Sequence, residues 1–324
     1  MPLFFWMLQH FIESQQLTKS LIFSLFQRAD HLRKGSHDVL KGKLLATLFY
    51  EPSTRTRLSF ESAMLKLGGQ VVTTENAKEF SSTVKGESLE DTTRVLSAYV
   101  DAIVIRHFEE GAAKRAAAIS TVPIINAGDG KGQHPSQALL DIYTIHRELG
   151  RLDNIKIAMV GDLAHGRTVR SLSYLLGKFE NIEIIFVSPE HLRIGDDIKE
   201  YLDRHDIHWR EEIDLQKVLP EADILYLTRI QKERMCPEEY ASSKGKYIIT
   251  EESLKLIKAT ARILHPLPHV EEIELPVETE QSDPRVAYFR QAENGLYIRM
   301  ALLEMLLNKR VRGSKDTMML RNEP

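Results

Sequence analysis

The chain of 324 residues contains a single cysteine, Cys236, so it cannot form an internal disulfide framework. That cysteine stands outside any His/Cys cluster, so no zinc-ligand pattern is present. The net charge is only -3, without the basic excess typical of nucleic-acid-binding proteins. No apolar run is long enough to cross a bilayer, and the opening PLFFWMLQHFI lacks the basic start of a signal peptide. We therefore expect a soluble, cytoplasmic protein without bound metal, nucleic acid or membrane.

Several catalytic signatures are also missing from the sequence. There is no GxxxxGK[ST] phosphate loop and no GxSxG nucleophile elbow, so no motif supports a P-loop enzyme or a serine hydrolase. The segment GDGKGQ, residues 128–133, is too loose to be a dinucleotide fingerprint. A nucleotide-dependent dehydrogenase is therefore supported only by the general alternation of strands and helices.

Apolar, strand-like runs alternate with helical patterns along most of the chain. Continuous Val/Ile/Leu runs separated by helices are typical of parallel strands covered on both faces. After a long helix over 136–149 the series starts again, which predicts two α/β domains, each a doubly wound parallel sheet flanked by helices. The predicted strands are 43–50, 70–74, 101–105 and 122–126 in the first series, and 155–160, 183–187, 223–227, 246–249 and 262–264 in the second.

The end of the chain divides into a helix and a tail. Residues 296–307 show helical periodicity, and we expect a C-terminal helix over 294–310 that returns to the first domain. The first domain is then 1–149 and the second is 150–293. Residues 311–324 are basic and polar and are predicted to form a flexible tail.

The stretch YEPSTRTRLSFE, residues 50–61, contains the densest group of anion-binding side chains. It follows a predicted strand, and Ser53 stands at the N-cap of a predicted helix. The free N–H groups of a first helical turn, beside hydroxyls and guanidiniums, favour a bound anion, most naturally a phosphate. The alternative is a capped helix with solvated arginines, but the number of donors and the lack of nearby acids favour the anion. The donors are Ser53, Thr54, Arg55, Thr56 and Arg57.

Polar side chains also follow the other strands, where ligands of open parallel sheets bind. Taken singly, each has a structural explanation, because a lone arginine is usually a salt-bridge partner and the HPLP segment can be a rigid strand exit. Their joint occurrence at strand ends favours a binding site with few carboxylates for a metal. These residues are Arg106, His107, His134, Gln137, Arg167, Thr168, Thr228, Arg229, Gln231 and the HPLP segment His265–Pro268.

The motifs resemble those of aspartate carbamoyltransferase catalytic chains over about residues 40–308. They are STRTR with SFE, QHPxQxLLD, MVGDL…GRT, LTRIQKER and HPLP. The first two are shared with ornithine carbamoyltransferases, whereas the proline of HPLP, where those enzymes have a cysteine, and TRIQKER indicate aspartate as acceptor. The resemblance implies carbamoyl transfer from carbamoyl phosphate to L-aspartate, an early step of pyrimidine biosynthesis, without a cofactor. An ornithine enzyme and a catalytically silent partner protein stay open as alternatives.

The resemblance also assigns substrate contacts. It gives the phosphate to Ser53, Thr54, Arg55 and Thr56, the carbamoyl oxygen to Thr56, Arg106 and His134, and the carbamoyl amino group to Gln137. It gives the aspartate carboxylates to Arg167, Arg229 and Gln231. The backbone of Leu267 and Pro268 would meet the carbamoyl and amino groups. The residues expected to carry catalysis are Arg55, Thr56, Lys85, Arg106 and His134, which hold two anions together and stabilise the oxyanion.

The segment 76–92 is locally a polar surface loop that leads into a helix. In the resembling family this loop enters the active site of the neighbouring subunit, and Ser81 and Lys85 occupy the matching positions. The resemblance therefore implies a homotrimer with shared active sites, to which regulatory chains or another pathway partner can bind. The chain departs from the family pattern at positions linked to domain closure, namely Ala164, His165, His269 and Glu293.

Overall fold

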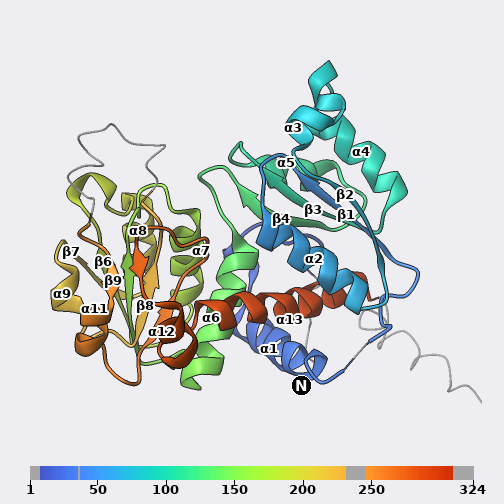
Figure 1. Cartoon of the computed structure of the whole chain (residues 1–324). Helices are drawn as coiled ribbons and strands as arrows, with labels where there is room; N and C mark the ends of the chain where they lie inside the picture. Colours follow the sequence, from blue (N-terminus) through green and yellow to red (C-terminus); the bar gives the residue numbers. More distant parts are fainter. Residues whose placement is uncertain (1–7, 36, 231–244, 309–324) are drawn as a thin grey trace, which may run out of the picture. The chain divides into compact units, whose positions relative to one another are not determined.

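The computed structural model describes residues 8–35, 37–230 and 245–308. The chain folds into two compact units (Figure 1). Unit 1 comprises residues 1–16, 23–130 and 296–324, and unit 2 comprises residues 17–22 and 131–295. The predicted tail, 311–324, lies outside the described residues.

Unit 1 is built on a four-stranded parallel sheet with the strand order β2-β1-β3-β4. On one face, Thr47 of β1 donates a hydrogen bond to Glu61 of helix α2, with 2.8 Å between Oγ1 and Oε1. On the other face, Ala46 and Leu48 of β1 join an apolar cluster with residues of α4 and α5. Helices therefore cover both faces of the sheet. The elements are β1 (Leu44–Phe49), α2 (Thr54–Lys66), β2 (Gln70–Thr74), α3 (Ala77–Phe80), α4 (Leu89–Tyr99), β3 (Ala102–His107), α5 (Ala112–Ile119) and β4 (Ile124–Asp129).

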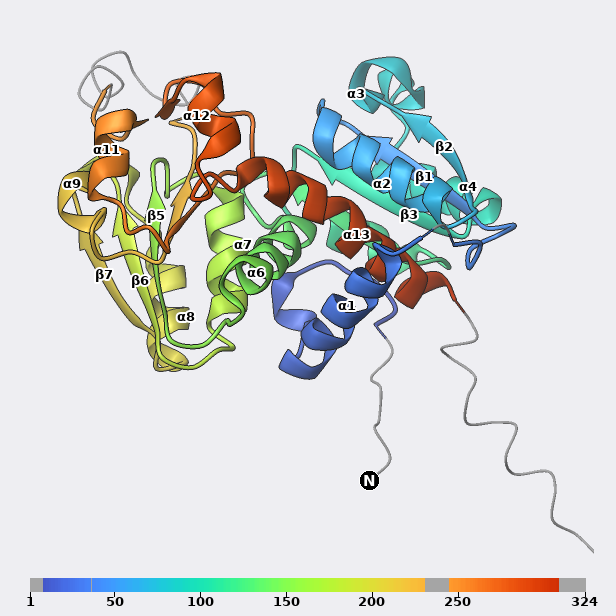
Figure 2. The ribbon, with the colours of Figure 1, turned by 60° about the horizontal axis from the view of Figure 1, so that its bottom comes forward.

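The C-terminal helix α13 (Tyr288–Leu307) packs on the N-terminal helix α1 (Lys19–Leu32), and the two lie side by side in Figure 2. In unit 1 the contact includes an ion pair, with Arg28 Nη2 2.8 Å from Glu304 Oε1. The predicted return of the C-terminal helix to the N-terminal region is confirmed. The helix begins at Tyr288, however, earlier than the predicted residue 294.

Unit 2 contains a five-stranded parallel sheet with the order β10-β8-β5-β6-β7. Helix α6 contacts one face, where Tyr226 of β8 reaches Asp141. On the other face, Ala158 and Leu225 pack with Leu215 of α9 and other apolar residues. The elements are α6 (Pro135–Leu149), β5 (Ile155–Val160), α7 (Arg167–Leu176), β6 (Ile182–Val187), α8 (Asp196–Arg204), β7 (His208–Glu212), α9 (Leu215–Val218), β8 (Ile224–Leu227), β9 (Ile249–Thr250), α11 (Glu251–Leu256), β10 (Arg262–Leu264), β11 (Ile273–Glu274) and α12 (Val277–Ser282).

The fold confirms the prediction of two doubly wound parallel sheets, with two errors of detail. The predicted strand 246–249 is only the short β9, which pairs with β11 outside the main sheet. The edge strand β7 was not predicted, because its sequence HWREE is mostly polar and has no apolar alternation; its residues are only partly buried. None of the described helices combines the length and the apolar character needed to cross a membrane.

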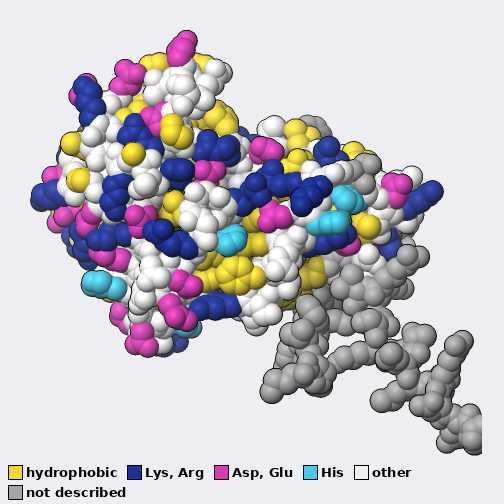
Figure 3. Space-filling view, turned by 90° about the horizontal axis from the view of Figure 1, so that it is seen from below, with side chains coloured by type: hydrophobic (Ala, Val, Ile, Leu, Met, Phe, Trp, Pro, Cys, Tyr) yellow, Lys and Arg dark blue, Asp and Glu magenta, His cyan; other side chains and the backbone are white. Residues whose placement is uncertain are grey.

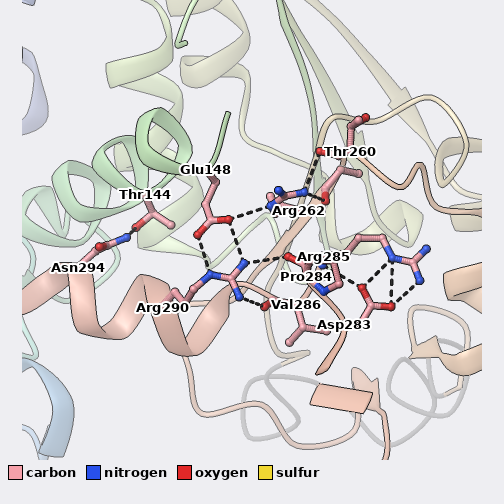
Figure 4. Close-up of polar contacts among 11 residues, drawn as sticks. Thr144, Glu148, Thr260, Arg262, Asp283, Pro284, Arg285, Val286, Arg290 and Asn294 are labelled. Carbon is pink, nitrogen blue, oxygen red and sulfur yellow. Dashed lines mark hydrogen bonds and ion pairs between the residues drawn. The ribbon is translucent and has the colours of Figure 1, made fainter. Parts of the chain in front are cut away.

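Ion pairs around Glu148 fix helix α6 against the second sheet and the start of α13 (Figure 4). Glu148 Oε2 accepts a hydrogen bond from Arg262 Nε at 2.8 Å, and Oε1 accepts one from Arg290 Nε at 2.8 Å. One turn before Glu148 on α6, Thr144 Oγ1 accepts a hydrogen bond from Asn294 Nδ2 of α13 at 3.0 Å. These contacts set the register between α6 and α13.

Candidate active site

Each sheet has one point where the strand order reverses. In unit 1 this point lies between β1 and β3, and in unit 2 it lies between β5 and β8. Ligands of open parallel sheets bind at such points, beyond the carboxyl ends of the strands. In unit 1, residues 53–56 follow β1 and Arg106 lies at the end of β3, and in unit 2, Arg167 and Arg229 follow β5 and β8. The topology therefore favours a ligand site in each unit at these strand ends.

In unit 1, Arg106 at the end of β3 lies beside the start of helix α2. Its backbone carbonyl accepts the N–H of Tyr50 at 2.9 Å, which aligns the exits of β1 and β3. Its Nη1 lies 3.4 Å from Ser53 Oγ, and its Nε lies 3.4 Å from Glu51 Oε2. The guanidinium is thus held next to the first turn of α2, as the sequence predicted.

The start of α2 has the features of an anion site. Ser53 is the N-cap residue, as predicted, but its side chain makes no capping hydrogen bond to the helix. A helix start of this kind attracts anions through its N–H groups and dipole. Arg55 is exposed and has no hydrogen-bond or ion-pair partner in the described part of the chain. Partial desolvation lowers the pKa of Arg55, and a bound phosphate would offset that penalty.

Arg57 does not belong to this anion site, which corrects the sequence prediction. Its Nη1 lies 3.2 Å from Glu61 Oε1 and its Nη2 lies 2.8 Å from Glu75 Oε2. Nη1 also donates to Thr73 Oγ1 at 3.2 Å. Arg57 therefore ties α2 to strand β2, and the expected absence of nearby acids was wrong. The signal was available, since Glu61 stands four residues after Arg57 on the same helix face.

Thr56, the innermost predicted phosphate contact, is supported by a residue that the sequence did not reveal. Thr56 is 6 % exposed, and its carbonyl accepts a hydrogen bond from Ser59 Oγ at 3.0 Å. Ser59 Oγ in turn accepts one from Arg299 Nη1 at 2.7 Å. Arg299 lies on α13 and is 3 % exposed. A buried cation therefore braces the first turn of α2.

The segment with Ser81 and Lys85 forms a compact turn in unit 1. Ser81 Oγ caps the short 3-10 helix Ser82–Lys85 by accepting the N–H of Thr83 at 3.2 Å. Lys85 is exposed and pairs with no described group of this chain. Its ammonium is therefore available to a ligand outside the chain's own fold.

In unit 2, His134 and Gln137 begin helix α6. His134 is the N-cap residue and is 4 % exposed, and its N–H donates to Ser171 Oγ at 2.8 Å. Gln137 Nε2 donates to Asp141 Oδ1 at 2.8 Å. The His134 ring also contacts its own helix, with Nδ1 3.3 Å from Ser136 Oγ, so both residues are held by groups of unit 2.

Arg167 and Arg229 follow the two strands at the reversal point of unit 2. Arg167 starts α7 after a loop in which His165, a departure from the family pattern, binds the buried Asp162. The N–H of His165 lies 3.0 Å from Asp162 Oδ1, and its Nδ1 lies 3.1 Å from the same oxygen. This pairing fixes the loop before Arg167. The third predicted aspartate contact, Gln231, lies outside the described residues.

The HPLP segment is held from several sides. His265 Nδ1 accepts the N–H of Leu267 at 2.7 Å, and the N–H of His265 donates to Gln291 Oε1 at 2.8 Å. His265 Nε2 lies 2.8 Å from Glu272 Oε1. Leu267 has a φ of +56° and is followed by a cis bond to Pro268. Side chains thus fix the backbone that was predicted to meet the carbamoyl group.

Charges of both signs are spread over the surface. Lys and Arg side chains lie among Asp and Glu side chains on the face shown in Figure 3, in keeping with the net charge of -3. Among the described residues, no three His, Cys, Asp or Glu side chains are grouped so that they could hold a metal ion.

Two doubly wound sheets whose reversal points present arginines and hydroxyls are typical of α/β proteins that bind small anions. Residues 9–147 match the family model described as the aspartate/ornithine carbamoyltransferase carbamoyl-P binding domain. Residues 153–306 match the Asp/Orn binding domain of the same family. The chain therefore belongs to the aspartate/ornithine carbamoyltransferase family.

Individual relatives agree with this assignment. Aspartate carbamoyltransferase 1, chloroplastic, of Pisum sativum is 57 % identical over 303 residues, which cover 91 % of this chain and 78 % of that protein. The catalytic subunit of aspartate transcarbamoylase from M. jannaschii has a TM-score of 0.86 at 48 % identity. The match covers 94 % of this chain and 100 % of that chain. Aspartate transcarbamoylase from Trypanosoma cruzi, solved with carbamoyl phosphate and aspartate, has a TM-score of 0.87 at 36 % identity. The match covers 93 % of this chain and 96 % of that chain.

Proposed function

We propose that this protein transfers the carbamoyl group of carbamoyl phosphate to the amino group of L-aspartate, giving N-carbamoyl-L-aspartate and phosphate. This reaction is an early step of pyrimidine biosynthesis. The observation that carries the proposal is the set of arginines, Arg106, Arg167 and Arg229, at the reversal points of both sheets. It occurs in a chain whose relatives are named for this reaction.

The chemistry fits a site of this composition. The aspartate amine attacks the carbonyl carbon, a C–N bond forms, and the C–O bond to phosphate then breaks as the amine loses a proton. The protein has to hold two anions together and stabilise the oxyanion of the tetrahedral intermediate. We assign the phosphate to Ser53, Thr54, Arg55 and Thr56, which start α2, and the oxyanion to Thr56, Arg106 and His134. Gln137 binds the carbamoyl amino group.

The acceptor is assigned to residues of the second half of the chain. Arg167 and Arg229, with Gln231, bind the aspartate carboxylates, and each charge-assisted hydrogen bond contributes about 1.5–3 kcal/mol. The backbone of Leu267 and Pro268 meets the carbamoyl and amino groups. On this scheme residues 1–149 with the C-terminal helix bind carbamoyl phosphate, and residues 150–293 bind aspartate.

We further propose a homotrimer in which Ser81 and Lys85 complete the site of a neighbouring subunit. The exposed Lys85, which has no described partner in its own chain, supports this arrangement. So do large apolar side chains on the surface of unit 1, since Leu65 is 59 %, Val84 is 66 % and Tyr99 is 68 % exposed. A native mass measurement tests the assembly, and a monomer with full activity would rule it out. The cytoplasmic location stays a prediction.

The function is tested by assaying carbamoylation of aspartate and of ornithine side by side. We expect turnover of aspartate, because two guanidiniums suit a dicarboxylate and not the ammonium side chain of ornithine. Turnover of ornithine alone would overturn the choice of acceptor. A protein that turns over neither amine, although it is folded and assembled, would favour the silent partner protein.

A further inference from the structure

Asp141 is a buried carboxylate at the centre of unit 2 to which the proposed mechanism gives no task. It lies on α6 and is 0 % exposed. Its Oδ1 accepts hydrogen bonds from Gln137 Nε2 at 2.8 Å and from Gln291 Nε2 at 2.6 Å. Its Oδ2 accepts one from the hydroxyl of Tyr226 at 2.8 Å. Three donors from three different elements therefore converge on one carboxylate.

The protonation of Tyr226 supports its role as a donor. Tyr226 is 0 % exposed, and burial, together with the nearby charge of Asp141, raises the pKa of Tyr226 well above its ordinary value. Its hydroxyl therefore keeps its proton and donates a hydrogen bond to Asp141. An ionised carboxylate satisfies all three donors, whereas a protonated acid would direct its own proton at one of them.

The carboxylate decides which way the amide of Gln137 is turned. Ionised aspartate only accepts hydrogen bonds, so Gln137 must present Nε2 to it and not Oε1. The other end of the amide, Oε1, has no hydrogen-bond partner in the described part of the chain. Gln137 as a whole is 7 % exposed, and its Oε1 is not among the fully buried unpaired atoms. An unpaired acceptor of this kind suits a ligand with an N–H group.

We propose that Asp141 is a positioning residue that sets substrate specificity: it fixes the amide of Gln137 so that Oε1 accepts the amino group of carbamoyl phosphate. The site thereby favours a carbamoyl phosphate over an acyl phosphate that has a methyl group at the same place, such as acetyl phosphate. This inference rests on the proposed function, and it adds the feature by which the site recognises its donor substrate.

The same carboxylate orients a second group near the proposed carbamoyl site. Gln291 gives its Nε2 to Asp141, so its Oε1 is left to accept the N–H of His265, which it does at 2.8 Å. The register of Gln291 is secured on both sides, by Arg290 with Glu148 and by Asn294 with Thr144 (Figure 4). Asp141 therefore helps to hold both Gln137 and the start of the HPLP segment.

The test is the ratio of kcat/KM for carbamoyl phosphate to kcat/KM for acetyl phosphate, each with aspartate as acceptor. Asp141→Leu removes the acceptor at similar size and frees the amide of Gln137 to turn. We expect the ratio to fall about tenfold or more, because a site built to bind an N–H group loses its discrimination when the acceptor is misplaced. The dissociation constant for inorganic phosphate should stay within about twofold, since that anion is assigned to α2 in unit 1.

Two further variants keep the inference falsifiable. Tyr226→Phe removes one donor to the same carboxylate without changing Gln137, so the ratio should be retained, and an equal fall in this variant would overturn the inference. Gln137→Met keeps the size but lacks the amide, so it should lower the ratio even if Asp141→Leu does not fold. An unchanged ratio in Gln137→Met, or in folded Asp141→Leu, would refute the assignment. If the wild-type protein does not carbamoylate aspartate, the proposed function itself fails.

Discussion

Gly161 allows the two strands at the reversal point of unit 2 to approach each other closely, and replacing it tests how the aspartate half of the site is built. Gly161 follows β5 with a φ of +117°, and an added Cβ would lie 2.2 Å from Thr228 O and 2.7 Å from Thr228 Oγ1. Normal contacts between such atoms are about 3.5 Å, so the exits of β5 and β8 would have to separate by about 1 Å. These exits lead to Arg167 and Arg229.

The expected magnitude of Gly161→Ala follows from two costs. Left-handed backbone strain costs about 1–2 kcal/mol, and forcing a methyl group into a packed site costs about 1–3 kcal/mol. The free energy of unfolding should therefore fall by about 2–5 kcal/mol, which lowers Tm by about 5–15 °C in a unit of this size. A displacement of about 1 Å at the arginines should lower kcat/KM for aspartate about 100-fold.

Gly150→Ala is the matched control, because Gly150 also has a positive φ, +71°, but nothing within 4 Å of an added Cβ. It should cost only the backbone strain of about 1–2 kcal/mol and leave the kinetics unchanged within about twofold. Thermal unfolding and steady-state kinetics at saturating carbamoyl phosphate measure both effects. If the two variants have the same Tm and the same kcat/KM, the close approach at Thr228 does not position the arginines.

Four further outcomes are expected. Arg55→Ala should lower kcat about 100-fold or more with an unchanged circular dichroism spectrum, because one cation of the phosphate site is lost; near-normal turnover would contradict the phosphate assignment. Equal amounts of Arg55→Ala and Lys85→Ala chains, reassembled together, should regain about a quarter of wild-type activity if sites are shared at random between neighbours, and no recovery in re-formed trimers would contradict sharing. Burial alone would raise the pKa of Glu148, but Arg290 and Arg262 outweigh it and hold the pKa below its ordinary value of 4.5. The stabilisation of the fold by ionised Glu148 is therefore fully present above pH 4.5 and is lost as the pH falls through the lower pKa of the folded protein. On acidification below pH 4.5, Glu148→Gln should therefore lose less Tm than the wild type. A molecule that joins a phosphonate to aspartate should bind at least about 100-fold more tightly than either substrate, as competition assays would show, and equal affinities would argue for another acceptor.

The sequence predicted those parts of the fold that are signalled by apolar periodicity. The strands 70–74, 155–160 and 262–264 have the predicted bounds. The start of α13, residues 288–293, was missed because it is buried partly through a polar group, Gln291 at 1 % exposure, which a search for apolar spacing does not detect. Strand β7 was missed for a related reason, since an edge strand can be polar on both faces.

At the site, the strand-end rule and the family resemblance found the residues expected to touch substrates, but not the residues that support them. Ser53 and Arg106 are brought together at the reversal point as predicted. Arg299 braces Ser59 across 240 residues of sequence, and no local pattern connects the two. Arg57 had been grouped with the anion site because it stands beside the other donors at the start of α2, although its own partners include acids of unit 1.

Helix α13 shows why sequence motifs do not identify the residues that support the site. Within unit 1 its Arg299 holds the first turn of α2, and within unit 2 its Gln291 pairs with Asp141 and His265. Neither residue is assigned to a substrate, so neither is marked by the chemistry of the reaction. Each is instead required by a buried polar partner, which costs about 1–3 kcal/mol when left unpaired. The residues that support the site therefore extend to a helix whose sequence, taken alone, indicates only an amphipathic C-terminal segment.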